Sequence, residues 1–364
     1  MSTLLDLGTL DTILGTSAAR FPDIRLVNHA REIRPEEYTW SDQRVDPLKA
    51  ARLFTEGATL IYSALHVSVP TLQELCAAMS LSLGAKTQAN IYLTPPAAQG
   101  FPRHWDRHDV LIVQVEGSKT WRMYEGGPAK PGPGEHYQRP EQEDTQPPAT
   151  ELTLRAGDWL YVPRGTIHEC EATDESSLHI TFGWLPYTWR DLFVDLLEQA
   201  TAEHAWLREE LPCHRACWND RSASRETVAL RIRELLTALD PGAAADLVRD
   251  DLIGAHRPAT QSALRDALGA MSDRSDTAFE GAKLRPGLLF SLSQAPDEPA
   301  ATLRAGGRRI AIDGDAADLA QRLLSGAPKH PDDDDATIGL LSRALVREGI
   351  LTTNHATPTI ENDA

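Results

Sequence analysis

Two histidines and one aspartate have the spacing in this 364-residue chain that best suits metal chemistry. His104 and Asp106 are one residue apart, so on a β-strand both side chains point to the same face. His168 follows 62 residues after Asp106, just beyond a turn of Pro and Gly residues. Two imidazoles and one carboxylate on one wall are typical of the facial triad that binds non-haem Fe(II) and leaves other coordination positions open. The competing interpretation is an exposed strand with alternating polar side chains.

The segments around these residues favour a β-rich domain that two helices precede. A helix is predicted over 47–61, with Gly57 as a candidate stop, and a second over 70–84, between Pro70 and Gly84. Period-two patterns rich in β-branched residues then predict short strands. They cover residues 88–93, 109–117, 120–124, 151–154, 158–163 and 178–184. Short strands without βαβ alternation indicate an antiparallel barrel or sandwich.

The C-terminal half has a different pattern of apolar residues. Apolar residues recur every three or four positions over 188–240, which predicts helices. After Pro286, strand-like pieces mix with two helices, in an order similar to a small winged-helix unit. The polar end of the chain predicts a disordered tail. We therefore expect four parts, with bounds 1–187, 188–285, 286–352 and 353–364.

The charge and the cysteine content exclude several classes of protein. The 36 basic and 53 acidic residues give a net charge of −17, which disfavours nucleic acid and anionic membranes as partners. Residues 291–364 alone carry seven Lys and Arg against twelve Asp and Glu. Four irregularly spaced cysteines do not form a disulfide framework. With no secretory signal and no apolar run long enough to span a bilayer, we expect a soluble cytoplasmic protein.

Four separated motifs resemble one known family. The segments NIYLTPPAAQGF, HWDRHDVLIVQVEGSKTW, GDWLYVPRGTIHE and SLHITFGW lie within residues 88–186. In this order they resemble the JmjC/cupin-fold ribosomal oxygenases, which are Fe(II)- and 2-oxoglutarate-dependent protein hydroxylases. The resemblance implies an α+β chain with a double-stranded β-helix (cupin or jelly-roll) JmjC domain over 1–187. A helical dimerisation region over 188–285 and a winged-helix-like domain over 286–352 would follow.

The resemblance also implies roles for individual residues. The His-x-Asp pair and His168 would bind iron, and Lys119 would pair with the distal carboxylate of 2-oxoglutarate. Asn90 and Thr181 are expected to make polar contacts with this co-substrate, although both also suit ordinary strand positions. Tyr92 would either line the pocket or pack within the barrel.

Several neighbouring residues are assigned other roles. His108 has the same strand parity as the His-x-Asp pair, but the family pattern favours His104 as the ligand. His179 is expected to line the pocket, since a fourth protein ligand would crowd the metal. Arg164 is expected to support its loop through hydrogen bonds. The segment Cys213-His214-x-x-Cys217 offers soft ligands without a second such pair, so free thiols are expected there.

The resemblance implies an oxygenase that uses Fe(II), 2-oxoglutarate and O₂ to hydroxylate a side chain of a protein or peptide. A basic ribosomal protein, modified at Arg or His, is the expected substrate class, and an acidic chain suits a basic partner. A tailoring hydroxylase of a peptide natural product is the alternative enzyme, because the Pro-rich stretch 130–148 could shape another groove. A non-catalytic cupin binding module is the alternative of another class. A homodimer is expected.

Overall fold

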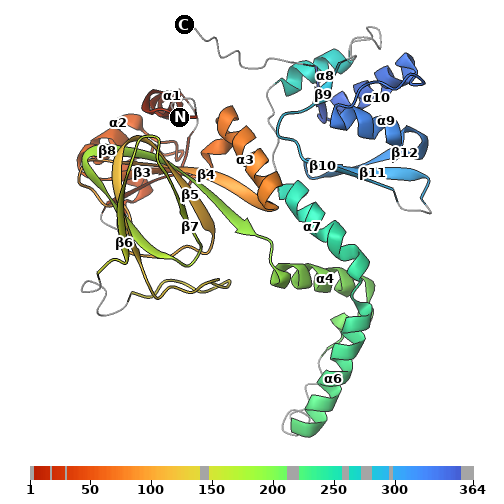
Figure 1. Ribbon diagram of the computed structural model, residues 1–364, viewed down its shortest axis with the longest axis horizontal. Helices are drawn as coiled ribbons and strands as arrows, with labels where there is room; N and C mark the ends of the chain where they lie inside the picture. The colour runs from red at the N-terminus through yellow and green to blue at the C-terminus, as the bar shows by residue number, and fades with distance from the viewer. Residues whose placement is uncertain are drawn as a thin grey trace. The chain divides into compact units, whose positions relative to one another are not determined.

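The computed structural model of the protein describes residues 4–16, 19–28, 31–139, 147–210, 221–255, 262–271, 281–294 and 298–353. Two compact units divide the chain, Met1–Pro186 and Tyr187–Ala364. Figure 1 shows a β-rich first unit and a second unit that begins with helices and ends in a mixed segment.

The first unit contains helices, short 3₁₀ turns and strands. Its helical elements are α1 (Leu7–Thr16), η1 (Pro35–Glu37), α2 (Pro47–Thr55), η2 (Leu65–Val67) and α3 (Pro70–Leu83). Its strands are β1 (Ile24–Asn28), β2 (Arg31–Glu32), β3 (Thr59–Tyr62), β4 (Ala85–Thr94), β5 (Asp109–Tyr124), β6 (Thr150–Arg155), β7 (Trp159–Val162) and β8 (Ile167–Pro186).

These strands form an antiparallel sheet in the order β2-β1-β3-β4-β8-β5-β6, and β7 also pairs with β5. The long strands β5 and β8 run together from the pair Asp109–Trp184 to the pair Tyr124–Ile167. Register shifts midway along this ladder bend both strands, as β-bulges do. The bend lets the sheet curve around a central space (Figure 1). The sheet therefore has an inner face and an outer face.

The outer face packs against the N-terminal helices. Ile91, Val113 and Ile180, from three adjacent strands, are buried in one apolar cluster with Leu53 of α2 and Leu72 of α3. Because side chains alternate along a strand, the neighbours of these residues in sequence face inward. The inner face is thus left to line the pocket described below.

Two predictions for this unit need correction. The helix predicted over 47–61 ends at Thr55, just before its candidate stop Gly57, which has a φ of +100°, and the residues after this glycine form β3 instead of helix. The strands predicted over 109–117 and 120–124 are one strand, β5, with Gly117 at a φ of +64° in its bulged region. The helix expected from Pro70 is confirmed, and Gly84 closes it in the left-handed conformation.

The second unit is helical first and mixed afterwards. Its helical elements are α4 (Trp189–Glu203), η4 (Ala205–Arg208), α6 (Arg221–Ala238), α7 (Pro241–Ala255), α8 (Ala263–Met271), α9 (Gly314–Ser325) and α10 (Asp335–Arg347). Its strands are β9 (Lys283–Leu284), β10 (Phe290–Ser293), β11 (Ala300–Ala305), β12 (Arg308–Asp313) and β13 (Leu351–Thr352).

The C-terminal part of this unit has its own core. Strands β10, β11 and β12 form one antiparallel sheet, and β9 pairs with β13. Leu303, Leu324 and Leu345, from a strand and two helices, are buried together. The winged-helix assignment and the four-part division stay predictions, and residues 354–364 of the expected tail lie outside the described residues. Within the part of the chain described here, no helix has the length and apolarity needed to cross a membrane.

Candidate metal centre and adjoining pocket

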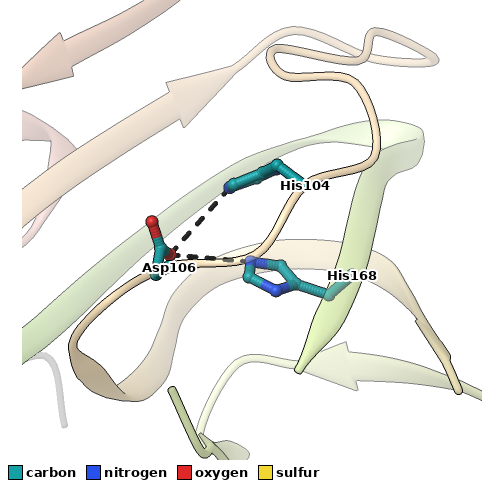
Figure 2. A group of neighbouring side chains, drawn as sticks. All are labelled: His104, Asp106 and His168. Carbon is teal, nitrogen blue, oxygen red and sulfur yellow. Dashed lines mark ion pairs between the residues drawn. The ribbon is translucent and has the colours of Figure 1, made fainter. Parts of the chain in front are cut away.

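His104, Asp106 and His168 meet at one point on the inner side of the curved sheet. One ligand-type atom from each side chain lies within 4.8 Å of the others. Asp106 Oδ2 is 3.9 Å from His104 Nε2 and 3.8 Å from His168 Nε2, and Figure 2 shows both imidazoles directed at this carboxylate. Two ring nitrogens and one carboxylate oxygen at these separations have the donor set of a facial triad for a divalent metal.

The His-x-Asp pair does not lie on a strand, contrary to the expectation. The segment between β4 and β5 has an isolated bridge only at His104, which pairs with His168. His104 N donates to His168 O at 3.0 Å, and His168 N donates to His104 O at 2.7 Å. Pro102 has no N–H for a continued ladder. The three side chains therefore meet through this single bridge, rather than through strand parity along the whole segment.

Each imidazole of this cluster is oriented by a backbone carbonyl. His104 Nδ1 lies 2.8 Å from Pro102 O, and His168 Nδ1 lies 2.9 Å from Thr166 O. A carbonyl oxygen only accepts, so the proton of each neutral ring is on Nδ1. Both Nε2 lone pairs are then directed at the shared point, as metal-bound histidines require.

Burial holds one of these rings in its neutral form. His168 is 4% exposed, and burial together with the adjacent His104 lowers the pKa of His168 to about 4. The side chains of His104 and Asp106 are each 32% exposed. The cluster therefore has one deeply buried ligand-type side chain and two that border the opening.

Lys119 places a buried cation in the same pocket. The side chain is 2% exposed, and burial lowers the pKa of its ammonium group. Lys119 Nζ donates to Thr94 Oγ1 at 2.9 Å, and the Cys170 thiol and the His179 ring also lie near this ammonium group. No carboxylate among the described residues forms an ion pair with Lys119. Burial of a charge without an oppositely charged partner costs free energy. Lys119 therefore fits a ligand that brings an anionic group into the pocket.

Two more polar atoms in the pocket have no hydrogen-bond partner among the described residues. They are Trp121 Nε1 and His179 Nδ1, both buried. The His179 ring stacks on Tyr92 with centroids 4.9 Å apart, and burial lowers the pKa of His179 well below its ordinary value. These atoms, together with Lys119, fit a compact polar molecule that reaches inward from the three ligand-type residues.

The remaining predicted residues have different positions. Thr181 lines the pocket, but Asn90 is not among the lining residues. Asn90 Oδ1 instead accepts a hydrogen bond at 2.9 Å from the N–H of Ala64, whose φ is +53°. His108 packs close to Gly183 and is not part of the cluster of ligand-type atoms. The contacts predicted for Asn90, Thr181 and Tyr92 with a co-substrate stay predictions.

The turn before His168 is held by a buried carboxylate. Asp109, which is 8% exposed, accepts hydrogen bonds from Tyr161 Oη at 2.8 Å and from Arg164 N at 3.2 Å. The Arg164 guanidinium lies 3.7 Å from the same carboxylate. Gly165 N donates to Asp106 O at 2.8 Å, which joins this turn to the ligand loop. Arg164 thus supports its loop as expected.

Several residues that line or organise the pocket were not predicted from the sequence. Trp121 lies two positions after Lys119 on β5, and Thr94 lies two positions after Tyr92 on β4, so strand parity would have found both. Cys170 lies two positions after His168 on β8, so the same parity applies to it, whereas Phe101 lies outside the strands and had no comparable signal. Residues 140–146 of the Pro-rich stretch, and the Cys213, His214 and Cys217 cluster, lie outside the described residues.

Comparisons with known proteins found relatives of this chain. Residues 64–192 match the family model of the JmjC domain. A Dictyostelium discoideum protein named bifunctional lysine-specific demethylase and histidyl-hydroxylase NO66 is 42% identical over 146 residues, 38% of this chain and 28% of that protein. Ribosomal oxygenase 1 of Rattus norvegicus is 31% identical over 248 residues, 64% of this chain and 42% of that protein. The chain thus spans less than half the length of these relatives.

A solved structure shows the same fold over most of the chain. It is YcfD, a ribosomal oxygenase from Escherichia coli, in complex with cobalt and 2-oxoglutarate. It covers 96% of this chain and 90% of its own, with a TM-score of 0.54 and 16% sequence identity. At this identity the likeness concerns the fold alone.

Proposed function

We propose, because residues 64–192 form a JmjC domain, that the protein is an Fe(II)- and 2-oxoglutarate-dependent oxygenase. It hydroxylates a side chain of a protein or peptide. The observation that carries the proposal is a single pocket that holds both the three ligand-type atoms and the buried Lys119. The first feature suits a ferrous ion, and the second suits the far carboxylate of a dianionic co-substrate.

The chain's own residues have separate tasks in this proposal. His104, Asp106 and His168 hold the metal, and the carbonyls that accept from both Nδ1–H groups keep each Nε2 directed at it. When bound with 2-oxoglutarate and O₂, the ion supplies the oxidising chemistry. Lys119 fixes the distal end of the co-substrate, and Thr94 holds the ammonium group in place.

The inner wall also excludes water from the reacting centre. The Tyr92, Trp121 and His179 rings line the pocket, and Trp121 and His179 are almost fully buried. Exclusion of water strengthens the interaction of Lys119 with a carboxylate, since the local dielectric constant is low. Trp121 Nε1 is a hydrogen-bond donor available to an oxygen of the co-substrate.

We further propose that the substrate is a basic protein, with ribosomal proteins modified at Arg or His as the first class to test. The names of the relatives and the charge of −17 support this choice. A cytoplasmic location is part of the proposal, and it agrees with the free thiols of Cys76 and Cys170.

Metal and co-substrate binding test the proposal directly. In an anaerobic titration with Fe(II) and 2-oxoglutarate, we expect a weak visible charge-transfer band from the native chain. His104→Ala should abolish the band. His108→Ala is the matched control, because it removes an imidazole from the same loop but outside the cluster of ligand-type atoms. Absence of the band in the native chain would support the non-catalytic binding module and overturn the oxygenase proposal.

Turnover then identifies the substrate. Native enzyme with ribosomal proteins should form succinate, and intact-mass analysis should find one added oxygen atom on one of them. Asp106→Ala should leave the masses unchanged. If only a peptide natural product gains oxygen, the tailoring hydroxylase replaces the ribosomal substrate in the proposal.

The helical region supports a homodimer as part of the same proposal. Trp189 and Phe193 on α4 are 75% and 55% exposed, and Leu230 and Leu236 on α6 are 53% and 66% exposed. Apolar faces of this extent are typical of subunit interfaces. Light scattering should give a dimer mass for the native chain and a monomer mass for Leu236→Glu, whereas Leu340→Glu on α10 should stay dimeric.

A further inference from the structure

The segment that carries two of the three ligand residues has little regular structure of its own. Residues 95–108 join β4 to β5 with a single isolated bridge, at His104. Apart from a local bond between Ala98 N and Pro95 O, their other backbone hydrogen bonds reach β8 or the turn before it. Ala97 N donates to Thr173 O at 2.6 Å, and Ala172 N donates to Ala98 O at 3.0 Å. The position of this segment against β8 therefore decides the distances between the ligand atoms.

A compact polar cluster joins this segment to β8 directly beside the ligands. Arg103 precedes His104, and Glu169 follows His168. Arg103 Nη2 lies 3.5 Å from Glu169 Oε1, and the Arg103 guanidinium lies 3.4 Å from the ring centroid of Tyr124. Tyr124 Oη donates to Glu169 Oε1 at 2.5 Å.

This cluster is shielded from solvent and lies behind the metal centre. Arg103 is 9% exposed, and the Glu169 side chain is 18% exposed. Glu169 follows His168 on β8, and Tyr124 follows Met123, the partner of His168 on β5, so both point to the face opposite the His168 imidazole. Arg103 contacts both of them on that face. An ion pair and a cation–π contact in such a shielded place are stronger than on the surface.

We propose that Arg103 is a positioning residue, which clamps the His104–Asp106 segment onto β8 through Glu169 and Tyr124 and so sets the affinity for the metal. The inference rests on the proposed function, because it needs the three ligand residues to bind a divalent ion. Residues that orient metal ligands from behind contribute about 10–100-fold to metal affinity. Loss of the Arg103 charge should have an effect of this size.

The test measures Co(II) affinity and thermal unfolding on the full chain. Arg103→Met keeps the aliphatic stem, and we expect it to weaken Co(II) binding at least tenfold at a temperature where the chain is folded. The unfolding temperature of the metal-free chain should fall as well, because Glu169 loses a shielded ion-pair partner. Arg103→Lys keeps the pairing with Glu169 and should recover part of the affinity. Arg122→Met is the matched control. Arg122 lies on β5 with its own ion pairs, to Glu151 at 2.7 Å and Glu171 at 3.5 Å.

The outcomes separate this inference from the proposed function. If the native chain binds no Co(II), both fail. If the native chain binds Co(II) and Arg103→Met binds it within twofold, only the positioning role is refuted. An equal loss of affinity in Arg122→Met also refutes it, as does a fall in unfolding temperature with unchanged affinity. Should Arg103→Met not fold, Glu169→Gln tests the same clamp, since it removes the charge and keeps a hydrogen-bond acceptor for Tyr124.

Discussion

Replacement of Lys119 by Met should change ligand affinity and protein stability in opposite directions. Lys119 is 2% exposed, and no carboxylate of the described chain is its ion-pair partner. A buried unpaired ammonium costs several kcal/mol, and its hydrogen bond to Thr94 returns about 2 kcal/mol. We therefore expect Lys119→Met to raise the free energy of unfolding of the ligand-free chain by about 1–2 kcal/mol.

The same substitution should strongly weaken the binding of 2-oxoglutarate. Loss of one partner from a buried, hydrogen-bonded charge pair costs about 2–5 kcal/mol, which corresponds to about 30-fold or more in the dissociation constant. Urea unfolding measures the first effect, and calorimetric titration of the metal-loaded enzyme with 2-oxoglutarate measures the second. Lys49→Met is the control, because Lys49 is largely solvated beside Asp46 and should change neither quantity by more than about 0.5 kcal/mol.

The pH dependence gives the sign of this effect independently. Burial lowers the pKa of Lys119 below 10.5, so between the lowered value and 10.5 the unfolded chain holds a proton that the folded chain has lost. Stability from this group therefore rises with pH in that window, and the advantage of Lys119→Met should shrink there. A variant that is less stable than the native chain and still binds 2-oxoglutarate normally would refute the reasoning.

Three further substitutions test other parts of the site. Below pH 6.5, His179→Phe should reduce the slope with which the free energy of unfolding falls as pH falls, by about 1.4 kcal/mol per pH unit. The reason is that the histidine of the unfolded chain takes up a proton that the buried one does not. Urea unfolding at several pH values measures this slope. Gly117→Ala should cost more than about 4 kcal/mol, since its Cβ would lie 1.7 Å from Ser176 O, whereas Gly84→Ala, with a similar φ and open space, should cost about 1 kcal/mol in the same unfolding assay. Asp109→Ala should cost about 2 kcal/mol of unfolding free energy, because two donors lose their acceptor.

Each of these predictions has a clear contrary result. An unchanged pH profile in His179→Phe would show that the native imidazole titrates freely. Equal costs for Gly117→Ala and Gly84→Ala would show that the bulge opens without strain. A stability loss below about 0.5 kcal/mol in Asp109→Ala would show that this carboxylate does not hold the turn.

Local signals in the sequence were sufficient for some elements. Pro70 and Gly84 correctly predicted the start and the end of one helix, because a proline suits the first turn and a glycine adopts the left-handed closing conformation. The helix predicted over 47–61 does end just before its candidate stop, Gly57, but the residues after this glycine were assigned wrongly, since Thr59–Tyr62 is a fully buried strand. A short continuous apolar run does not distinguish a buried strand from a buried helix by periodicity.

The site shows a similar division between local and distant information. The spacing of His104, Asp106 and His168 pointed to one wall, and the structure brings the three together, but through a single backbone bridge. Contacts such as Arg103 with Tyr124 depend on a chain reversal over more than 20 residues. No local pattern encodes the partner of such a contact, so only the folded structure shows it.

The long pairing of β5 with β8 determines what a misfolded form of this protein would lose. Lys119 and Trp121 come from one of these strands, and His168, His179 and Thr181 come from the other. A slip of one residue between the two strands turns a whole row of side chains to the opposite face. A molecule misfolded in this way would bind neither the proposed metal ion nor 2-oxoglutarate. A preparation that contains such molecules should be a mixture of fully active and inactive molecules. It should have fewer active sites per mole of protein, and each active site should have an unchanged turnover rate.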